Sequence, residues 1–92
     1  MKKAIILCLL IMPMWAQKLM IPMDLAQTDH LKAYGIAFWV LDQGINIEWL
    51  LNYRGGSFLI DYYANIDREC VLRGVTYETV DAGMMGTIYG TI

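Results

Sequence analysis

The residues best suited to chemistry lie in one short segment, residues 52–57, where two glycines follow an arginine. Glycines let a ligand approach the backbone, free N–H groups at a helix start attract anions, and an arginine adds a fork of donors. The candidate ligand-binding residues here are Arg54, Gly55, Gly56 and Ser57. The segment matches neither of the phosphate loops G-x-G-x-x-G and G-x-x-x-x-G-K-S/T. The favoured interpretation is therefore a turn from a strand into a helix, with a ligand role left open.

Two aspartates suggest a second kind of chemistry. Asp24 follows the first predicted strand, and Asp81 follows the third. Open parallel sheets bind ligands beyond the carboxyl ends of their strands. Two carboxylates there could exchange protons with a substrate or hold a cation, provided that their strands are neighbours. Asp24 therefore joins the candidate ligand-binding residues, and the alternative is that both aspartates are turn and helix-capping residues.

Other chemistry has weak support in the sequence. His30 is the single histidine and stands near the start of a predicted helix, so we interpret it as a solvated residue rather than a metal ligand. Cys70 has no histidine nearby and lies on the apolar face of a predicted helix, which favours a buried thiol over a nucleophile. We therefore predict no catalytic residue, no metal site and no cofactor in this chain.

The elements that must position these residues follow from an alternation of short apolar and amphipathic runs. Strands are predicted at residues 18–23, 45–51 and 75–80, and helices at residues 30–43, 61–73 and from 82 onward. The candidate N-caps are Thr28-Asp29 and Asp81, and the candidate C-caps are Gly44 and Gly74. In the first helix, side chains at helical spacing are expected to fill the core: Leu31, Tyr34, Phe38 and Leu41, widened by Ala37 and Val40.

The order of these elements, βαβαβα, predicts the fold class. Crossovers of about 20 residues suit right-handed parallel connections, so we expect an α/β fold of three layers with a partial doubly wound parallel sheet. A parallel sheet of three strands leaves apolar edges and faces uncovered. The expectation is therefore a truncated portion of a longer domain, and the alternative is a complete subunit whose sheet pairs with a partner.

The first sixteen residues have the layout of a secretory signal. Lys2 and Lys3 precede an apolar run at residues 4–12, and residues 13–16 supply a cleavage site. The apolar run is shorter than the about 20 residues that a membrane span needs. We therefore predict a helical signal peptide at residues 1–16, a domain at residues 17–92, and an exported protein, periplasmic or extracellular. An uncleaved anchor or a first strand is the alternative.

Composition and charge exclude some classes of binding partner. The chain has 92 residues, 58% of them hydrophobic, and a formal net charge of −2. Cleavage after Ala16 removes two of the seven basic residues and none of the nine acidic ones. An acidic surface without a basic stripe excludes nucleic-acid binding and attraction to anionic lipid. Cys70 would be the one cysteine left, so no intramolecular disulfide is expected.

Two segments, "TDHLKAYG" at residues 28–35 and "WLLNYRGGSF" at residues 49–58, carry a family resemblance that extends over residues 18–92. They resemble the N-terminal part of exported bacterial proteins labelled asparagine synthetase B, which have a class I glutamine-amidotransferase-like α/β architecture. The resemblance implies an N-terminal fragment without catalysis of its own, with the Cys-His pair beyond Ile92. Its partner would be the missing C-terminal part of the same protein or a second copy of the chain.

The family label implies glutamine-dependent asparagine synthesis, which these residues do not support. Such synthetases use an N-terminal cysteine and a Ser-Gly-Gly-x-Asp-Ser loop. This chain has Lys2 at the second position, Gln17 after the predicted cleavage, and "RGGSFL" in the glycine segment. The remaining alternative, from another functional class, is a small exported binding or interaction module.

Overall fold

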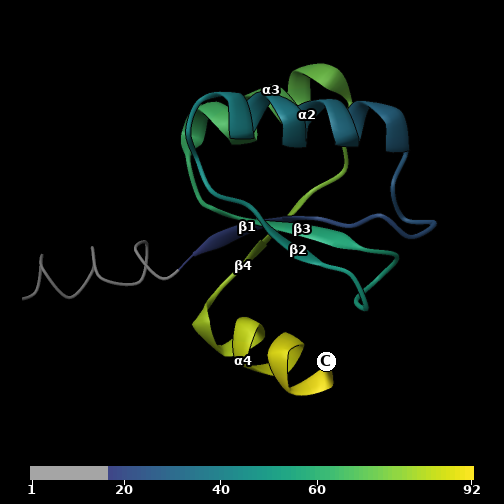
Figure 1. The fold of residues 1–92 in the computed structure, drawn as a ribbon, viewed down its shortest axis with the longest axis vertical. Helices are drawn as coiled ribbons and strands as arrows, with labels where there is room; N and C mark the ends of the chain where they lie inside the picture. The colour runs from purple at the N-terminus through teal and green to yellow at the C-terminus, as the bar shows by residue number, and fades with distance from the viewer. Residues whose placement is uncertain (1–16) are drawn as a thin grey trace, which may run out of the picture.

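The structure, a computed structural model, describes residues 17–92, so the predicted signal peptide lies outside the described residues. Four strands and three helices follow one another in the order βαββαβα. Figure 1 shows them from purple at the start of β1 to yellow at the end of α4. The elements are β1 (Lys18–Ile21), α2 (His30–Asp42), β2 (Glu48–Leu50), β3 (Ser57–Asp61), α3 (Ala64–Arg73), β4 (Glu78–Val80) and α4 (Ala82–Thr91).

The four strands form one antiparallel sheet in the order β2-β3-β1-β4. Lys18 lies opposite Asp61 of β3 and opposite Val80 of β4, which defines the register of the β1–β3 and β1–β4 pairs. Each crossover, through α2 or α3, joins two strands of the same direction that have a third strand between them. This is the split βαβ arrangement of ferredoxin-like folds, with α4 added after β4.

The prediction of a parallel, doubly wound sheet is wrong, although the general α/β class holds. The error lies at Ser57–Asp61, which forms β3 and pairs with both β1 and β2. The glycine segment is consequently a hairpin loop between β2 and β3, and α3 begins at Ala64. Along β3, Phe58 and Ile60 face one core and Leu59 faces the other. A strand that is apolar on both faces lacks the alternation by which strands are recognised.

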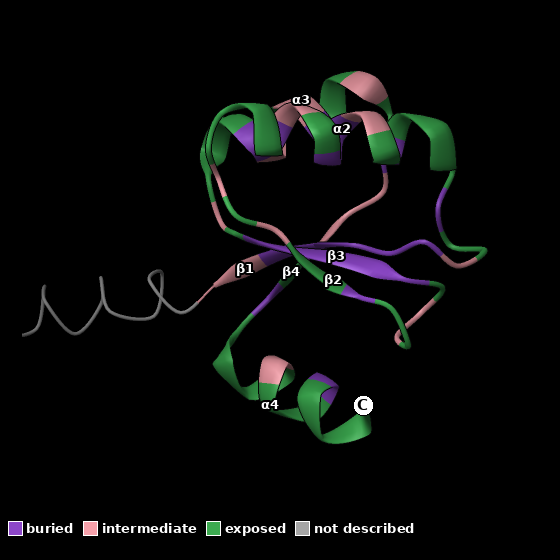
Figure 2. Ribbon diagram, viewed as in Figure 1, coloured by how far each residue is buried: buried purple, intermediate pink, exposed green. Residues whose placement is uncertain are grey.

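Helices cover both faces of the sheet (Figure 1). α2 and α3 lie side by side over one face, where the larger core forms, and α4 lies below the other face. Figure 2 shows most of β1 and β3 as buried, while most of β2 at the sheet edge and most of α4 are exposed. The larger core joins Leu19, Ile21, Phe58 and Ile60 of the sheet to Ala33, Ile36, Ala37, Val40, Ile66 and Cys70 of the helices. The smaller core contains Met20, Leu50, Leu59, Val80 and Ile88.

The helix ends confirm the predicted caps. The side chains of Asp29 and Asp81 each accept a hydrogen bond from a backbone N–H three residues ahead, at 3.0 and 2.8 Å. Gly44 and Gly74 follow the ends of α2 and α3 with φ of 78° and 69°. At both glycines two backbone N–H groups return to carbonyls of the last turn, the Schellman pattern. No helix among the described residues is long and apolar enough to cross a membrane.

Candidate functional site

The glycine segment forms a loop that is pressed against the chain leaving β1. Arg54, Gly55 and Gly56 have positive φ values of 45°, 78° and 93° in succession. A Cβ atom on Gly55 would lie 2.6 Å from the carbonyl oxygen of Met23, so only glycine fits there. The N–H of Met23 donates to the carbonyl of Arg54 at 3.2 Å. The buried Ser57 donates its hydroxyl to the same carbonyl, also at 3.2 Å.

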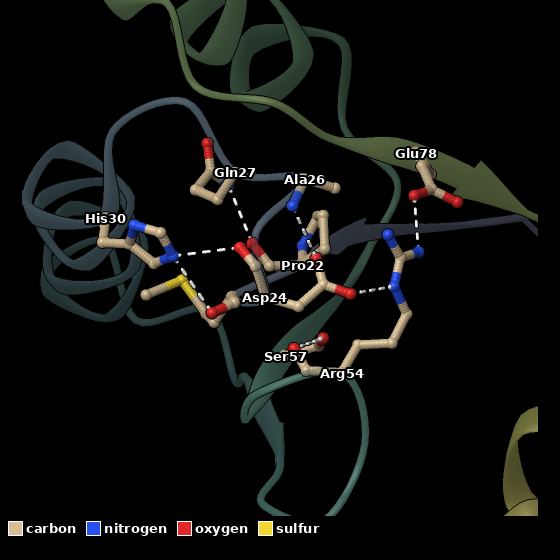
Figure 3. A network of polar contacts seen from close by, with 9 residues as sticks. Pro22, Asp24, Ala26, Gln27, His30, Arg54, Ser57 and Glu78 are labelled. Carbon is tan, nitrogen blue, oxygen red and sulfur yellow. Dashed lines mark hydrogen bonds and ion pairs between the residues drawn. The ribbon is translucent and has the colours of Figure 1, made fainter.

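The side chain of Arg54 binds two carboxylates, one from each neighbouring segment (Figure 3). Its Nε lies 2.8 Å from Oδ2 of Asp24, and its Nη1 lies 2.6 Å from Oε2 of Glu78. The hydrogen bond from Arg54, followed by that from the N–H of Ala26, lowers the pKa of Asp24. The two carboxylates likewise raise the pKa of Arg54, with the bond to Asp24 contributing most. Together, the guanidinium of Arg54 and the two carboxylates carry a net negative charge, which is unfavourable for an incoming anion.

Asp24 and Arg54 were both predicted from the sequence as ligand-binding residues, and in the structure they form an ion pair. The proposed neighbourhood of Asp24 and Asp81 is wrong. β1 and β4 are adjacent but antiparallel, so the residues that follow them lie at opposite ends of the sheet. Asp81 caps α4 instead. Glu78 was missed, because its meeting with Arg54 depends on the order of the strands and has no local signal.

Gln27 is a second residue that the sequence reasoning missed. It is buried, and its amide makes four hydrogen bonds. The Nε2 atom donates to the carbonyls of Pro22 and Thr76, both at 2.9 Å. Its Oε1 atom accepts from the N–H groups of Thr28 and Thr76, at 3.1 and 2.8 Å. Gln27 therefore joins the loop after β1 to the segment before β4, with every polar atom of its side chain satisfied.

His30 belongs to the same end of the sheet (Figure 3). Its Nε2 lies 3.1 Å from the carbonyl oxygen of Met23 and 3.0 Å from that of Asp24. Because both neighbours are acceptors, this nitrogen must carry the proton. His30, Asp24, Gln27, Arg54 and Glu78 are hereafter called the loop network. No group of three potential metal-ligating side chains occurs within residues 17–92.

Cys70 is fully buried in the larger core, as predicted. Burial raises the pKa of its thiol to about 11, and the negative charges of Asp67 and Glu69 contribute to the same increase. The thiol is therefore protonated and unreactive at neutral pH. A shallow groove of about 300 Å³ lies beside it and contains no charged side chain. The lining residues are Thr28, Cys70, Val71, Gly74, Val75, Thr76 and Tyr77.

The outer face of α2 carries a row of exposed apolar side chains, where the sequence had placed core residues. The buried face of the helix consists instead of Ala33, Ile36, Ala37 and Val40. The core prediction is therefore confirmed for Ala37 and Val40 but wrong for the exposed row, because α2 is apolar on both faces and the smaller residues face the sheet. The row comprises Leu31, Tyr34, Phe38 and Leu41, which are 83%, 48%, 72% and 56% exposed.

Aromatic contacts connect this row to the edge of the sheet. Trp49, the middle residue of β2, is 54% exposed and stacks on Phe58, with ring centroids 5.7 Å apart. Phe58 in turn meets Tyr34 edge to face at 5.8 Å. The indole N–H of Trp49 donates to the carbonyl of Gly56 at 2.8 Å, which holds the ring in place. Trp49 and the row on α2 together are called the α2–β2 surface.

The α2–β2 surface is large for a protein of this size. At about 150–250 Å² for each large side chain, its exposed fractions amount to roughly 600 Å² of apolar surface. That is the upper end of what soluble monomers expose in one patch, and such patches usually mark an interaction site. β2 itself pairs with β3 alone and lies at the sheet edge. Its three residues, Glu48–Leu50, include no proline or lysine, and Glu48 is the one charged residue on this edge.

Comparison of the chain with protein-family models, curated proteins and solved structures gave no match.

Proposed function

We propose that this chain acts as an interaction module, which binds another polypeptide through the α2–β2 surface. The observation that carries the proposal is the continuous apolar surface formed by four side chains of α2 and by Trp49. At about 25 cal/mol per Å², burying roughly 600 Å² would stabilise a complex by about 15 kcal/mol before the costs of association. Those costs are about 4–15 kcal/mol or more, so the stabilisation from this surface is of the order that a complex needs.

The loop network supports this proposal over ligand binding at the glycine segment. Arg54 already donates to Asp24 and Glu78, and the hydroxyl of Ser57 donates within the loop. The backbone amides that an anion was expected to find at a helix start lie in a hairpin between two strands instead. The side chains of Arg54 and Ser57 and the N–H groups of Gly56 and Ser57 have partners within the fold, so the network has a structural role in the proposal.

The resemblance to exported proteins labelled asparagine synthetase B supports a further part of the proposal: the module belongs to an exported protein, periplasmic or extracellular. This part rests on the sequence segments at residues 28–35 and 49–58 and on the signal layout of residues 1–16. Because the sheet is antiparallel, we do not extend the proposal to the amidotransferase-like architecture. Asparagine synthesis has no observation in its favour and is not proposed.

A photoreactive benzophenone amino acid placed at position 38, in cells that produce the full chain, tests the proposed function. The expected result is an intermolecular adduct of one defined mass. Replacing Leu31 and Leu41 by lysine should abolish it, because both residues belong to the same surface. The same amino acid at position 65, where Asn65 is exposed on α3, is the control and should give no adduct. A folded protein without an intermolecular adduct from position 38 would contradict the proposal.

A further inference from the structure

We infer that the polypeptide which covers the α2–β2 surface is a second copy of this chain, related by a two-fold axis perpendicular to the sheet. This inference rests on the proposed function and names its partner. In the dimer, β2 pairs antiparallel with β2 of the second copy, and the two sheets become one of eight strands. The two α2 helices then lie antiparallel on the same side of that sheet. Closed two-fold contacts are the commonest interfaces of homo-oligomers.

The row on α2 is complementary to itself when it is reversed. Its members stand at positions 31, 34, 38 and 41, which are symmetric about Ile36. An antiparallel pair centred there brings Leu31 near Leu41 of the second copy and Tyr34 near Phe38 of the second copy. Each exposed apolar side chain meets another one, at the interaxial distance of about 8–10 Å that packed helices adopt.

The strand and the helix require the same axis. Trp49 is the middle residue of β2, so an antiparallel β2 pair has its axis beside Trp49. The axis of the helix pair passes near Ile36, two residues from Tyr34. The contacts Trp49–Phe58 and Phe58–Tyr34, at 5.7 and 5.8 Å, connect Trp49 through Phe58 to the middle part of α2. One two-fold axis therefore serves both the edge strand and the helix row.

The charges at the ends of α2 favour the antiparallel arrangement. His30 and Lys32 stand in the first turn, and Asp42 is the last residue of the helix. This distribution is the reverse of the one that the helix dipole favours. Neither Lys32 nor Asp42 forms an ion pair within residues 17–92. In an antiparallel pair each Asp42 lies at the end of the dimer where the first turn of the other helix carries Lys32.

The size of the surface agrees with a stable dimer. Roughly 600 Å² of apolar side chain, together with the backbone of β2 and its flanks, approaches the about 800 Å² per partner of a standard interface. Glu48 does not obstruct the pairing, because its carboxylate accepts a hydrogen bond from Tyr89 of α4 on the opposite face of the sheet. The face toward α2 thus carries Trp49 alone from the middle of β2.

Sedimentation of matched variants of the full chain tests the inference. At about 100 µM, well above a micromolar Kd, we expect a dimer for the unaltered protein. Phe38→Glu should weaken dimerisation at least about tenfold, because position 38 lies in the centre of the interface. Leu72→Glu is the matched control, since Leu72 on α3 is also 72% exposed and should leave the dimer unchanged. Circular dichroism verifies that both variants fold.

A complementary pair of variants tests the antiparallel register itself. Tyr34→Lys alone should also weaken the dimer, but mixing it with Phe38→Glu should restore association as a heterodimer. The reason is that position 38 of one chain lies near position 34 of the other. A monomeric unaltered protein, an equal effect of Leu72→Glu, or no restoration would each overturn the inference. If the adduct from position 38 contains a different protein, the proposed function holds and the second copy is wrong; if no intermolecular adduct forms, both fail.

Discussion

Single residues of the loop network hold three segments of the chain at one end of the sheet. Arg54 binds Asp24 and Glu78, and Gln27 binds the backbone on both sides of its loop. Each side chain therefore connects the loop after β1 to a distant segment, either the β2–β3 hairpin or the chain near β4. Such connections stabilise the observed strand order, in which β1 lies between β3 and β4.

In the loop between β2 and β3, Gly55 is the residue whose replacement should destabilise the fold most. Gly44 and Gly55 share a φ of 78°, but only Gly55 approaches other backbone atoms. Gly44→Ala should therefore lower the free energy of unfolding by about 1–2 kcal/mol, the cost of the left-handed conformation alone. Gly55→Ala should cost a further 1–3 kcal/mol, roughly, because the new methyl group would meet the carbonyl of Met23 at 2.6 Å. Urea unfolding measures both, and equal losses would contradict the close approach.

Asp24 should make the protein sensitive to acid. Arg54 lowers the pKa of Asp24 in the folded state from its ordinary value of 3.8. The ion pair therefore stabilises the fold fully above that ordinary value, and its contribution is lost as the pH falls through the lowered pKa. The free energy of unfolding should decrease below about pH 4, and less steeply in Asp24→Asn. Asp42→Asn, at an exposed aspartate without an ion pair in the described chain, is the control under dilute conditions where the protein is monomeric. Identical acid profiles for the unaltered protein and Asp24→Asn would show that the pair contributes nothing.

Among the elements, α2 shows what the sequence could and could not predict. Its N-cap Asp29 and the glycine after its end were predictable, because capping depends on residues within one turn. Its buried face was not predictable, since apolar residues surround the helix and the pattern offers two faces. The structure buries the face with the smaller side chains, which lets the helix lie close to the sheet. The larger side chains are left for the α2–β2 surface.

The two faces of α2 should respond differently to truncation. Ile36 is fully buried against the sheet, so Ile36→Ala should lower the free energy of unfolding by about 2–5 kcal/mol. Phe38 is 72% exposed in the single chain. Phe38→Ala should change the free energy of unfolding by less than about 0.5 kcal/mol under dilute conditions where the protein is monomeric. Chemical denaturation at low concentration compares the two, and the reverse order would show that the predicted row faces the core after all.

At the scale of the whole molecule, one element decided the fold. The strands at residues 18–21, 48–50 and 78–80 lie within predicted strands, and all three helices overlap predicted helices. β3 was not predicted, and its presence makes the sheet antiparallel with split crossovers instead of parallel. As a consequence, Asp81 and Asp24 lie at opposite ends of the sheet. Local patterns determine helix ends and strand positions, but the pairing of distant strands depends on contacts such as those of Arg54. Asp24 and Arg54 of the loop network were therefore predictable as candidates, but their geometry and the network residues Gln27 and Glu78 were not.

Export is the remaining prediction at this scale. Pairing in the sheet begins directly after the predicted cleavage position, since the carbonyl of Gln17 already accepts the N–H of Tyr62 at 3.4 Å. Cleavage after Ala16 would therefore leave the four strands described within residues 17–92 intact. Mass spectrometry of the protein from the producing cells should find a chain that starts at Gln17 in the exported fraction. Lys2→Glu with Lys3→Glu should reduce export, because the positive start of a signal would be lost. A folded chain that stays within the cell and retains residues 1–16 would contradict the prediction of a signal peptide. It would not affect the description of residues 17–92.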